Sequence, residues 1–284
     1  MSLRIIAFSL VALIGLNACQ TVEHRNQTIA IPIAGTTEKL AATVVYPPGT
    51  GPFPLAILNH GTPASRAKRA ELGYWLKPVP IDALVARGFA VLVPIRRGFG
   101  ATGGEYRAGI GSCSDPEFYL SSLNASEDIA AAISYASQLP SVDASRILLL
   151  GHSAGGIASM AAASAAPAGV KAVVNFSGGR GSGRSSSAVG VPCYPERMAE
   201  AIGSYAATIK VPVLWYYVEN DTFFGPAVVR SWYEAFTRSG GTGTLVIDPA
   251  YGNEGHYVLM AQGGDKQWGP ALDAFLVQVG FPLN

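Results

Sequence analysis

Charged side chains are scarce in this sequence. Asp, Glu, Lys and Arg make up 14% of its 284 residues, and the formal net charge is +1. No long run of lysine or arginine occurs, and the one local cluster, Arg66, Lys68 and Arg69, is typical of a solvated face. The sequence therefore does not predict a surface that binds nucleic acid.

Histidine is also rare, with four residues in the chain. They lie far apart, at His24, His60, His152 and His256, and no His-x-x-x-His pair occurs. Zinc sites usually draw several ligands from short, repeated spacings, so this pattern makes a zinc site unexpected. We expect no metal and no organic cofactor.

The longest apolar run near the N-terminus, from Ile5 to Leu16, is too short to span a membrane. It follows Arg4 and precedes Asn17-Ala18-Cys19, which is the layout of a signal peptide. The end of this segment resembles a bacterial lipobox, in which Cys19 is acylated and becomes the first mature residue. We expect a leader over residues 1–18 and a tail over residues 19–27.

The leader predicts an exported protein of the bacterial periplasm or outer membrane, attached to the membrane only through a lipid on Cys19. Plain secretory cleavage and an internal apolar start are the alternatives. With Cys19 acylated, two cysteines remain, Cys113 and Cys193. In an oxidising compartment they favour a disulfide, and the alternative is two buried thiols.

Apolar residues make up 49% of the chain, which is enough for one large core over residues 28–284. Short β-rich runs alternate with helical patterns, which predicts an α/β domain with a mainly parallel sheet. The expected strands are 28–33, 40–46, 54–59, 89–93, 147–150, 172–176, 211–218 and 244–247. The expected helices are 81–87, 125–138, 154–166, 227–238 and 271–279.

The pentapeptide Gly151-His-Ser153-Ala-Gly155 lies between one of these strands and a helix rich in small residues. This is the setting of a nucleophile elbow, a tight strand-turn-helix whose crowded backbone requires glycine on both sides of the serine. The amide of Ala154 then lies at the helix N-terminus, where it favours developing negative charge. The alternative is a glycine-rich turn with an incidental hydroxyl.

A serine nucleophile needs a base that is oriented by a carboxylate. His256 lies in a polar loop after the last strand, whereas we expect the elbow to direct the side chain of His152 away from the serine. Asp221 follows the strand 211–218 and is preferred to Glu219 because it lies further into the loop. The chain order Ser153, Asp221, His256 is the order found in α/β-hydrolases.

Together with Asn59-His60-Gly61 and Arg96-Arg97-Gly98-Phe99-Gly100, these motifs resemble those of the α/β-hydrolase superfamily. Over residues 28–280 the chain is most similar to the dienelactone hydrolase-like and prolyl-oligopeptidase-like branch. The resemblance implies a mainly parallel central sheet flanked by helices on both faces, and Thr62 as the second oxyanion amide. Dienelactone hydrolases proper use cysteine where this chain has Ser153.

The expected activity is hydrolysis of a small-molecule carboxylic ester through an acyl-enzyme. An exported serine peptidase that acts on short peptides is one alternative, although the chain has no propeller or other large gating domain. A non-catalytic envelope binding protein of the same fold is the other, and an intact Ser, Asp and His weigh against it.

Several residues around this centre have two interpretations each. His60 contacts substrate or braces the oxyanion loop, and Phe223 and Tyr74 line the substrate pocket or belong to the core. Trp75 and Phe224 have the same two interpretations. Arg96 and Arg97 bind a substrate carboxylate or anchor loop carbonyls. The Gly/Ser-rich segment and helix over 178–207 have the length of a cap above the site.

Overall fold

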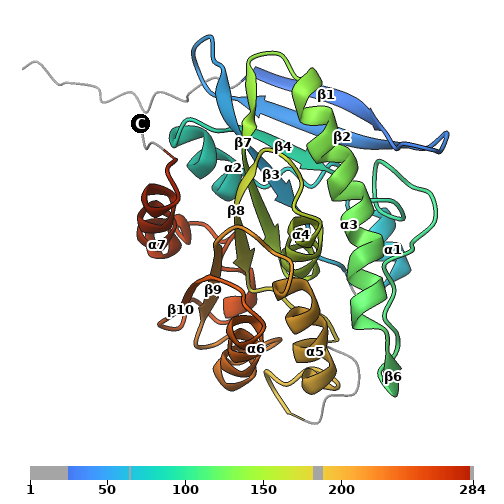
Figure 1. Ribbon diagram of the computed structural model, residues 1–284, viewed down its shortest axis with the longest axis vertical. Coiled ribbons are helices and arrows are strands. Elements are labelled where there is room, and N and C mark those ends of the chain that lie inside the picture. The colour runs from blue at the N-terminus through green and yellow to red at the C-terminus, as the bar shows by residue number, and fades with distance from the viewer. Residues whose placement is uncertain (1–24, 64, 182–187, 282–284) are drawn as a thin grey trace, which may run out of the picture.

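An eight-stranded sheet forms the centre of the computed structural model, which describes residues 25–63, 65–181 and 188–281 (Figure 1). The strand order is β1-β2-β4-β3-β7-β8-β9-β10, and β2 alone runs against its neighbours. The strands are β1 (Arg25–Pro32), β2 (Lys39–Tyr46), β3 (Phe53–Asn59), β4 (Ala90–Pro94), β7 (Val142–His152), β8 (Val170–Phe176), β9 (Val213–Val218) and β10 (Gly243–Asp248).

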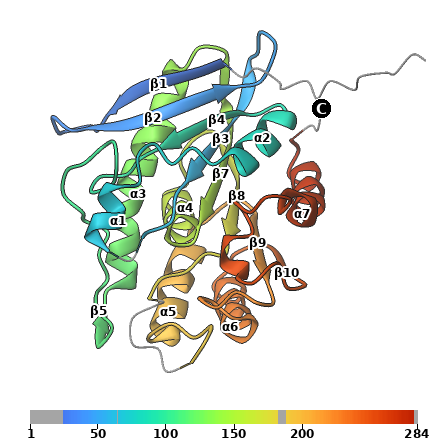
Figure 2. The same cartoon turned by 180° about the vertical axis from the view of Figure 1, so that it is seen from behind.

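Helices cover both faces of this sheet (Figures 1 and 2). One face carries α3 (Phe118–Tyr135), α4 (Ala154–Ser164), α5 (Pro195–Ala206) and α6 (Pro226–Arg238). The other face carries α2 (Pro78–Ala86) and α7 (Asp265–Gln278). Each layer encloses a hydrophobic core of its own against the sheet. The expected α/β fold, with a mainly parallel sheet between helices, is confirmed.

The inner strands are apolar along almost their whole length because both of their faces are covered. β4 and β9 consist entirely of buried residues, and β8 has one exposed residue, Lys171. A parallel strand between two helical layers has no solvated side, so its sequence reads as a continuous apolar run. This explains why the positions of these strands could be predicted from the sequence.

The order of β4, β3 and β7 creates a crevice at one edge of the sheet. From β3 the chain crosses through α2 to β4, and then through α3 back to β7 on the other side of β3. In open α/β sheets, ligands bind at the carboxyl ends of the strands where the order reverses in this way. Here those ends are Asn59 of β3 and His152 of β7.

The structure departs from the sequence expectation mainly at helix starts and in loops. α7 begins at Asp265 although Pro270 lies inside it. Proline removes a helical hydrogen bond and usually ends a helix, so the pattern predicted a start after it. Burial of Trp268 and Leu272, on either side of the proline, accompanies the continuous helix. The short helix α1 (Arg66–Ala70) and the hairpin of β5 (Gly111–Ser112) and β6 (Asp115–Pro116) were not predicted.

Within the described residues, no helix has both the length and the hydropathy needed to cross a bilayer. The expected leader over 1–18, Cys19 and His24 lie outside the described residues.

Candidate active site

Ser153 occupies a strained turn between β7 and α4. Its φ of 56° and ψ of −126° lie in a region that residues with a side chain rarely adopt. Its N–H donates to the Phe176 carbonyl at 2.9 Å, and its own carbonyl accepts from the Gly179 amide at 3.3 Å. The end of β8 and the loop that follows it therefore hold the backbone of the serine in place.

Glycine is required at two positions around this turn, and a third position is crowded. A Cβ atom on Gly151 would collide with the Gly155 carbonyl, and one on Gly155 would collide with the carbonyls of Asn59 and His60. A Cβ atom on Gly61 would lie 3.1 Å from the Cβ of Ser153. The backbones of β7, α4 and the loop after β3 thus meet at the serine, and the elbow interpretation predicted the crowding at Gly151 and Gly155.

His256 and Asp221 form a buried pair. Nδ1 of His256 lies 3.0 and 3.1 Å from the two carboxylate oxygens of Asp221, and the side chains are 2% and 0% exposed. Asp221 Oδ1 also accepts from the amides of Phe223 and Phe224, each at 2.9 Å. A carboxylate only accepts, so Nδ1 carries the proton and Nε2, on the opposite edge of the ring, is left as an acceptor.

Two side chains hold the loop that carries His256. Glu254 accepts from the His256 amide at 2.9 Å, and Nε2 of His152 lies 2.8 Å from the His256 carbonyl. Burial, and next the neighbouring His256, lower the pKa of His152 to about 3, so His152 is neutral and Nε2 donates. Sequence reasoning found no role for His152, because nothing in the sequence predicts which loop faces the end of β7.

The amides of Thr62 and Ala154 were the predicted oxyanion donors. Thr62 follows β3 by three residues, and Ala154 is the first residue of α4. Among the described residues, neither N–H donates to a protein acceptor. Both residues line the pocket that Ser153 and His256 also line, which is where the prediction requires them.

This pocket has a volume of about 480 Å³. Its apolar wall includes Leu72, Trp75, Ile110, Phe223 and Met260. The ring of Phe223 stacks on His256, with ring centroids 4.1 Å apart. The dimensions suit a small ligand that is largely apolar.

Residues 57–281 match the alpha/beta hydrolase family, over most of the chain. The chain belongs to this family. No curated protein sequence matches it.

Solved structures of three kinds share this alpha/beta hydrolase fold. A dienelactone hydrolase from Anabaena variabilis is 18% identical, with a TM-score of 0.59, and the match covers 92% of this chain and 99% of that one. An esterase from Pyrococcus furiosus is 19% identical, with a TM-score of 0.61 and coverage of 90% and 94%. An acylaminoacyl peptidase from Pyrococcus horikoshii is 14% identical, with a TM-score of 0.65 and coverage of 92% and 43%. Esterases and peptidases thus both share the fold.

His60 lies outside the lining of the pocket of this alpha/beta hydrolase, so of its two interpretations the structure contradicts substrate contact and supports bracing. It is fully buried, its Nε2 accepts from the Arg96 amide at 3.1 Å, and its Nδ1 lies 2.7 Å from the Gly61 carbonyl. The Phe99 ring packs against it, with centroids 4.6 Å apart. His60 braces the loop that leads to Thr62.

Among the aromatic residues expected at the pocket, Phe223 lines it and Tyr74 does not. Tyr74 is 39% exposed and outside the lining, whereas its neighbour Trp75 lines the pocket. The irregular chain before α2 has no periodicity from which the inward residue could be chosen. Phe224 is buried and packs against Trp232, so it belongs to the core.

Arg96 and Arg97 both anchor neighbouring chain segments. Arg97 binds Asp128 at 2.7 Å and Glu127 at 2.8 Å. Arg96 donates to the His60 carbonyl at 2.7 Å. Neither arginine lines the pocket.

The segment expected to form a cap divides into two parts. Its helix, α5, packs against α4 and α6 in the layer on the sheet. Of the described residues before it, Gly179, Arg180 and Gly181 line the pocket. Residues 182–187, in the middle of the segment, lie outside the described part of the chain.

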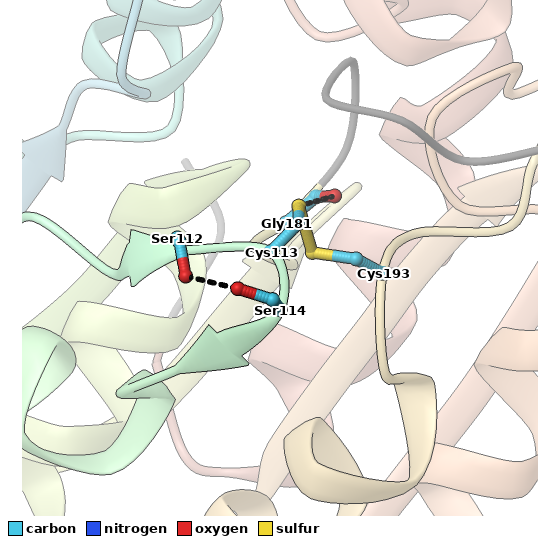
Figure 3. The surroundings of a disulfide bond; sticks show 5 residues. All are labelled: Ser112, Cys113, Ser114, Gly181 and Cys193. Atoms are coloured by element: carbon cyan, nitrogen blue, oxygen red, sulfur yellow. Dashed lines mark hydrogen bonds between the residues drawn. A yellow bond between two sulfur atoms is a disulfide. The ribbon is translucent and has the colours of Figure 1, made fainter.

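Cys113 and Cys193 form the predicted disulfide, which is confirmed (Figure 3). Their Cα atoms are 5.6 Å apart, across 80 residues of sequence. Cys113 lies at the turn of the β5–β6 hairpin, and the Cys193 amide donates to the Gly181 carbonyl at 3.1 Å. Residues 109–111 and 179–181 both line the pocket, so the bond joins two of its walls.

Proposed function

We propose that this alpha/beta hydrolase is a serine-dependent carboxylic ester hydrolase with Ser153 as nucleophile, His256 as base and Asp221 as the orienting carboxylate. The observation that carries the proposal is that the elbow serine and the Asp221-bound His256 line one pocket. A weak hydroxyl nucleophile requires such a base, and the base requires such a partner.

The proposed reaction has two steps. Ser153 Oγ attacks the ester carbonyl carbon while its proton passes to Nε2 of His256, and the carbonyl electron pair moves onto oxygen. The amides of Ala154 and Thr62 stabilise that oxyanion, and its collapse expels the alcohol, which takes the proton from His256. Water then attacks the acyl-enzyme through the same histidine and releases the acid. No metal or organic cofactor takes part.

Two alternatives remain for the same site. A peptidase would use the same residues on an amide bond, and a binding protein would retain the pocket without turnover. The fold is shared with esterases and with a peptidase, so fold alone does not choose between them. The ester proposal is preferred because the pocket is small and largely apolar.

A panel of p-nitrophenyl esters of rising acyl length, assayed beside dipeptide amides, tests the proposal. We expect ester turnover that is lost in Ser153→Ala, and a fluorophosphonate that labels Ser153 in the wild type. Turnover of the amides at rates equal to the esters would identify a peptidase. No turnover and no labelling would identify a binding protein.

We further propose that the protein is exported and that Cys19 carries a lipid anchor. The protein expressed with its own leader should then partition with membranes. Cys19→Ser should release it into the soluble fraction or leave it unprocessed. Soluble, correctly cleaved wild-type protein would contradict the anchor and favour plain secretory cleavage.

A further inference from the structure

Two loops carry the Asp221–His256 pair, one after β9 and one after β10, and they are connected on both sides of Asp221. Before Asp221, Asn220 Oδ1 accepts from the Tyr251 amide at 2.8 Å. Asn220 Nδ2 donates to the Tyr251 and Gly252 carbonyls, each at 3.1 Å. The side chain of Asn220 thus fastens the start of the His256 loop to the segment that follows β9.

Glu254 makes the corresponding connection after Asp221. Its Oε1 accepts from the Thr222 amide at 3.2 Å and from the His256 amide at 2.9 Å, and its Oε2 accepts from the Thr222 hydroxyl. One carboxylate therefore bridges the residue that follows Asp221 and the backbone of the base. Hydrogen bonds to an ionised acceptor are stronger than those between neutral groups, so the strength of this bridge depends on the charge of Glu254.

The two loops touch between these connections, at Gly255. A Cβ atom on Gly255 would collide with the side chain of Val218 and come within 2.6 Å of Asn220 Oδ1. The Gly255 amide donates to the Asn220 carbonyl at 3.1 Å. Because the backbones meet here, the position of one loop constrains the other.

Glu254 is ionised at neutral pH. Partial burial raises its pKa, but the hydrogen bonds from Thr222 and from the His256 amide, together with the charge of His256, lower it by more, and the net pKa lies below the usual value. The attraction between two charges acts on both partners. The Glu254 carboxylate therefore favours the protonated form of His256.

Two further titratable side chains pack against the ring of His256, and both are neutral at neutral pH. Burial, and next His256, lower the pKa of His152 to about 3. The pKa of Tyr257 is raised, first by burial and then by Glu254 and Asp221, so its hydroxyl keeps its proton. The remaining charged or titratable side chains of the pair and its pocket are Asp221, the buried Tyr217 that interacts with it, Lys68, Arg69 and Arg180. A substitution of Glu254 alters none of these groups.

We propose that Glu254 is a positioning residue, whose carboxylate holds the Asp221 loop against the His256 loop and stabilises the protonated histidine of the transition state. The inference rests on the proposed ester hydrolysis at Ser153, in which His256 takes up the serine proton. Glu254 is not among the described residues that line the pocket, so it acts on kcat through the pair and leaves substrate binding unchanged.

Two substitutions separate the shape of Glu254 from its charge. Glu254→Gln keeps an acceptor for both amides and removes the charge, whereas Glu254→Ala removes the bridge. With a p-nitrophenyl ester, kcat should fall several-fold in Glu254→Gln and about 10-fold to 10²-fold in Glu254→Ala, because small displacements of a reacting group are costly. KM should stay within about twofold of the wild type. Glu219→Gln, at an exposed residue directly after β9, is the control and should keep the wild-type kcat.

The pH profile of kcat/KM tests the role of the charge, which a purely structural contact would not affect. Without the Glu254 carboxylate the protonated form of His256 is less favoured, so the acid limb should move to lower pH in Glu254→Gln. It should stay in place in Glu219→Gln. An acid limb that does not move in Glu254→Gln, or that moves equally in Glu219→Gln, would overturn the proposal. So would a wild-type kcat in Glu254→Ala.

Thr222→Val tests the bridge from its other end, because it removes the hydroxyl that donates to Glu254 and leaves the His256 amide in place. It should lower kcat less than Glu254→Ala does. In the double variant the two losses should not add, since both substitutions act on one connection. Fully additive losses would overturn the bridge.

Hydrogen exchange separates this inference from the proposed function, because it needs no turnover. In the Ser153→Ala protein, adding Glu254→Ala should speed amide exchange in both loops, over residues 219–224 and 251–257. Faster exchange in both loops, without hydrolysis or fluorophosphonate labelling of the wild type, would support the bridge and contradict the esterase. Hydrolysis by the wild type with exchange that Glu254→Ala leaves unchanged would support the esterase and overturn the bridge.

Discussion

The pocket is lined on one side by Ser153 and His256 and on another by Arg69 and Arg180. The two sets differ in how many of their polar groups have hydrogen-bond partners within the protein. Asp221 accepts from His256 and from two backbone amides, and His152 and Glu254 fix the His256 loop. Across the pocket, Arg180 and Arg69 keep buried donors without partners among the described residues. The groups named on the first side have hydrogen-bond partners within the protein, and several donors on the second side do not.

A reacting group must be held in one geometry before substrate arrives, so its hydrogen bonds are made within the fold. A buried donor without a partner, as on the other side, calls for a partner that the described residues do not supply, such as an ordered water or an ion. Substitutions on the side of Ser153 and His256 should therefore have the largest effects, and loss of the bonds that support the pocket should have smaller ones.

Removal of the Ser153 hydroxyl should have the largest effect. Ser153→Ala deletes the nucleophile while the turn keeps its hydrogen bonds to β8, so kcat for ester hydrolysis should fall on the order of 10³-fold or more. Steady-state assays with p-nitrophenyl esters measure the loss, and circular dichroism checks the fold. Ser164→Ala, at the far end of α4, is the control. Turnover near the wild-type level in Ser153→Ala would rule out this nucleophile.

Loss of the Asp221 charge should have the next largest effect. Asp221→Asn cannot stabilise a protonated His256 and favours the wrong tautomer, so kcat should fall about 10²-fold to 10⁴-fold at neutral pH. Glu219→Gln is the control, because Glu219 is exposed and directly follows β9, two residues before Asp221. A larger loss in Glu219→Gln than in Asp221→Asn would assign the carboxylate to Glu219 instead.

Reduction of the Cys113–Cys193 bond should destabilise the fold by roughly 4 kcal/mol in the chain-entropy model, because the bond closes a loop of 80 residues. Thermal unfolding with and without reducing agent measures this change. Two titratable thiols at positions 113 and 193 in the denatured, unreduced protein would show that the bond is absent.

Acid should lower the stability of the fold, because His152 is buried in its neutral form. Burial lowers the pKa of His152 to about 3, from 6.5, so below pH 6.5 the unfolded chain takes up a proton that the folded chain does not. This contribution to stability is complete above pH 6.5 and is lost as the pH falls toward 3, by about 2 kcal/mol at pH 5. Melting temperatures at pH 7 and pH 5 measure the loss.

His152→Gln should flatten that pH dependence, because glutamine can still donate to the His256 carbonyl but does not titrate. The remaining dependence of the melting temperature on pH should come in part from His60. The pKa of His60 is lowered well below its usual value, first by burial and then by Arg96. An unchanged slope in His152→Gln would show that other groups set the acid stability.

The sequence predicted the sheet and the elbow because both depend on local patterns. Runs of buried residues located β3, β4, β7, β8 and β9, and the glycines around Ser153 follow from the crossing of three backbones. The pocket walls could not be predicted in this way. The segments that bear Arg180 and Trp75 have no periodicity, and their contacts lie outside the segments themselves, such as those of Arg180 with Ala108 and of Trp75 with His60.

The disulfide also bears on how this protein can be altered. It joins the β5–β6 hairpin to Cys193, whose amide donates to the Gly181 carbonyl, so a backbone shift on either side acts on the other. Substitutions in groups that share a backbone shift do not combine additively. A mutant library that varies residues 109–111 and 179–181 together therefore reaches specificities that scanning either loop alone misses.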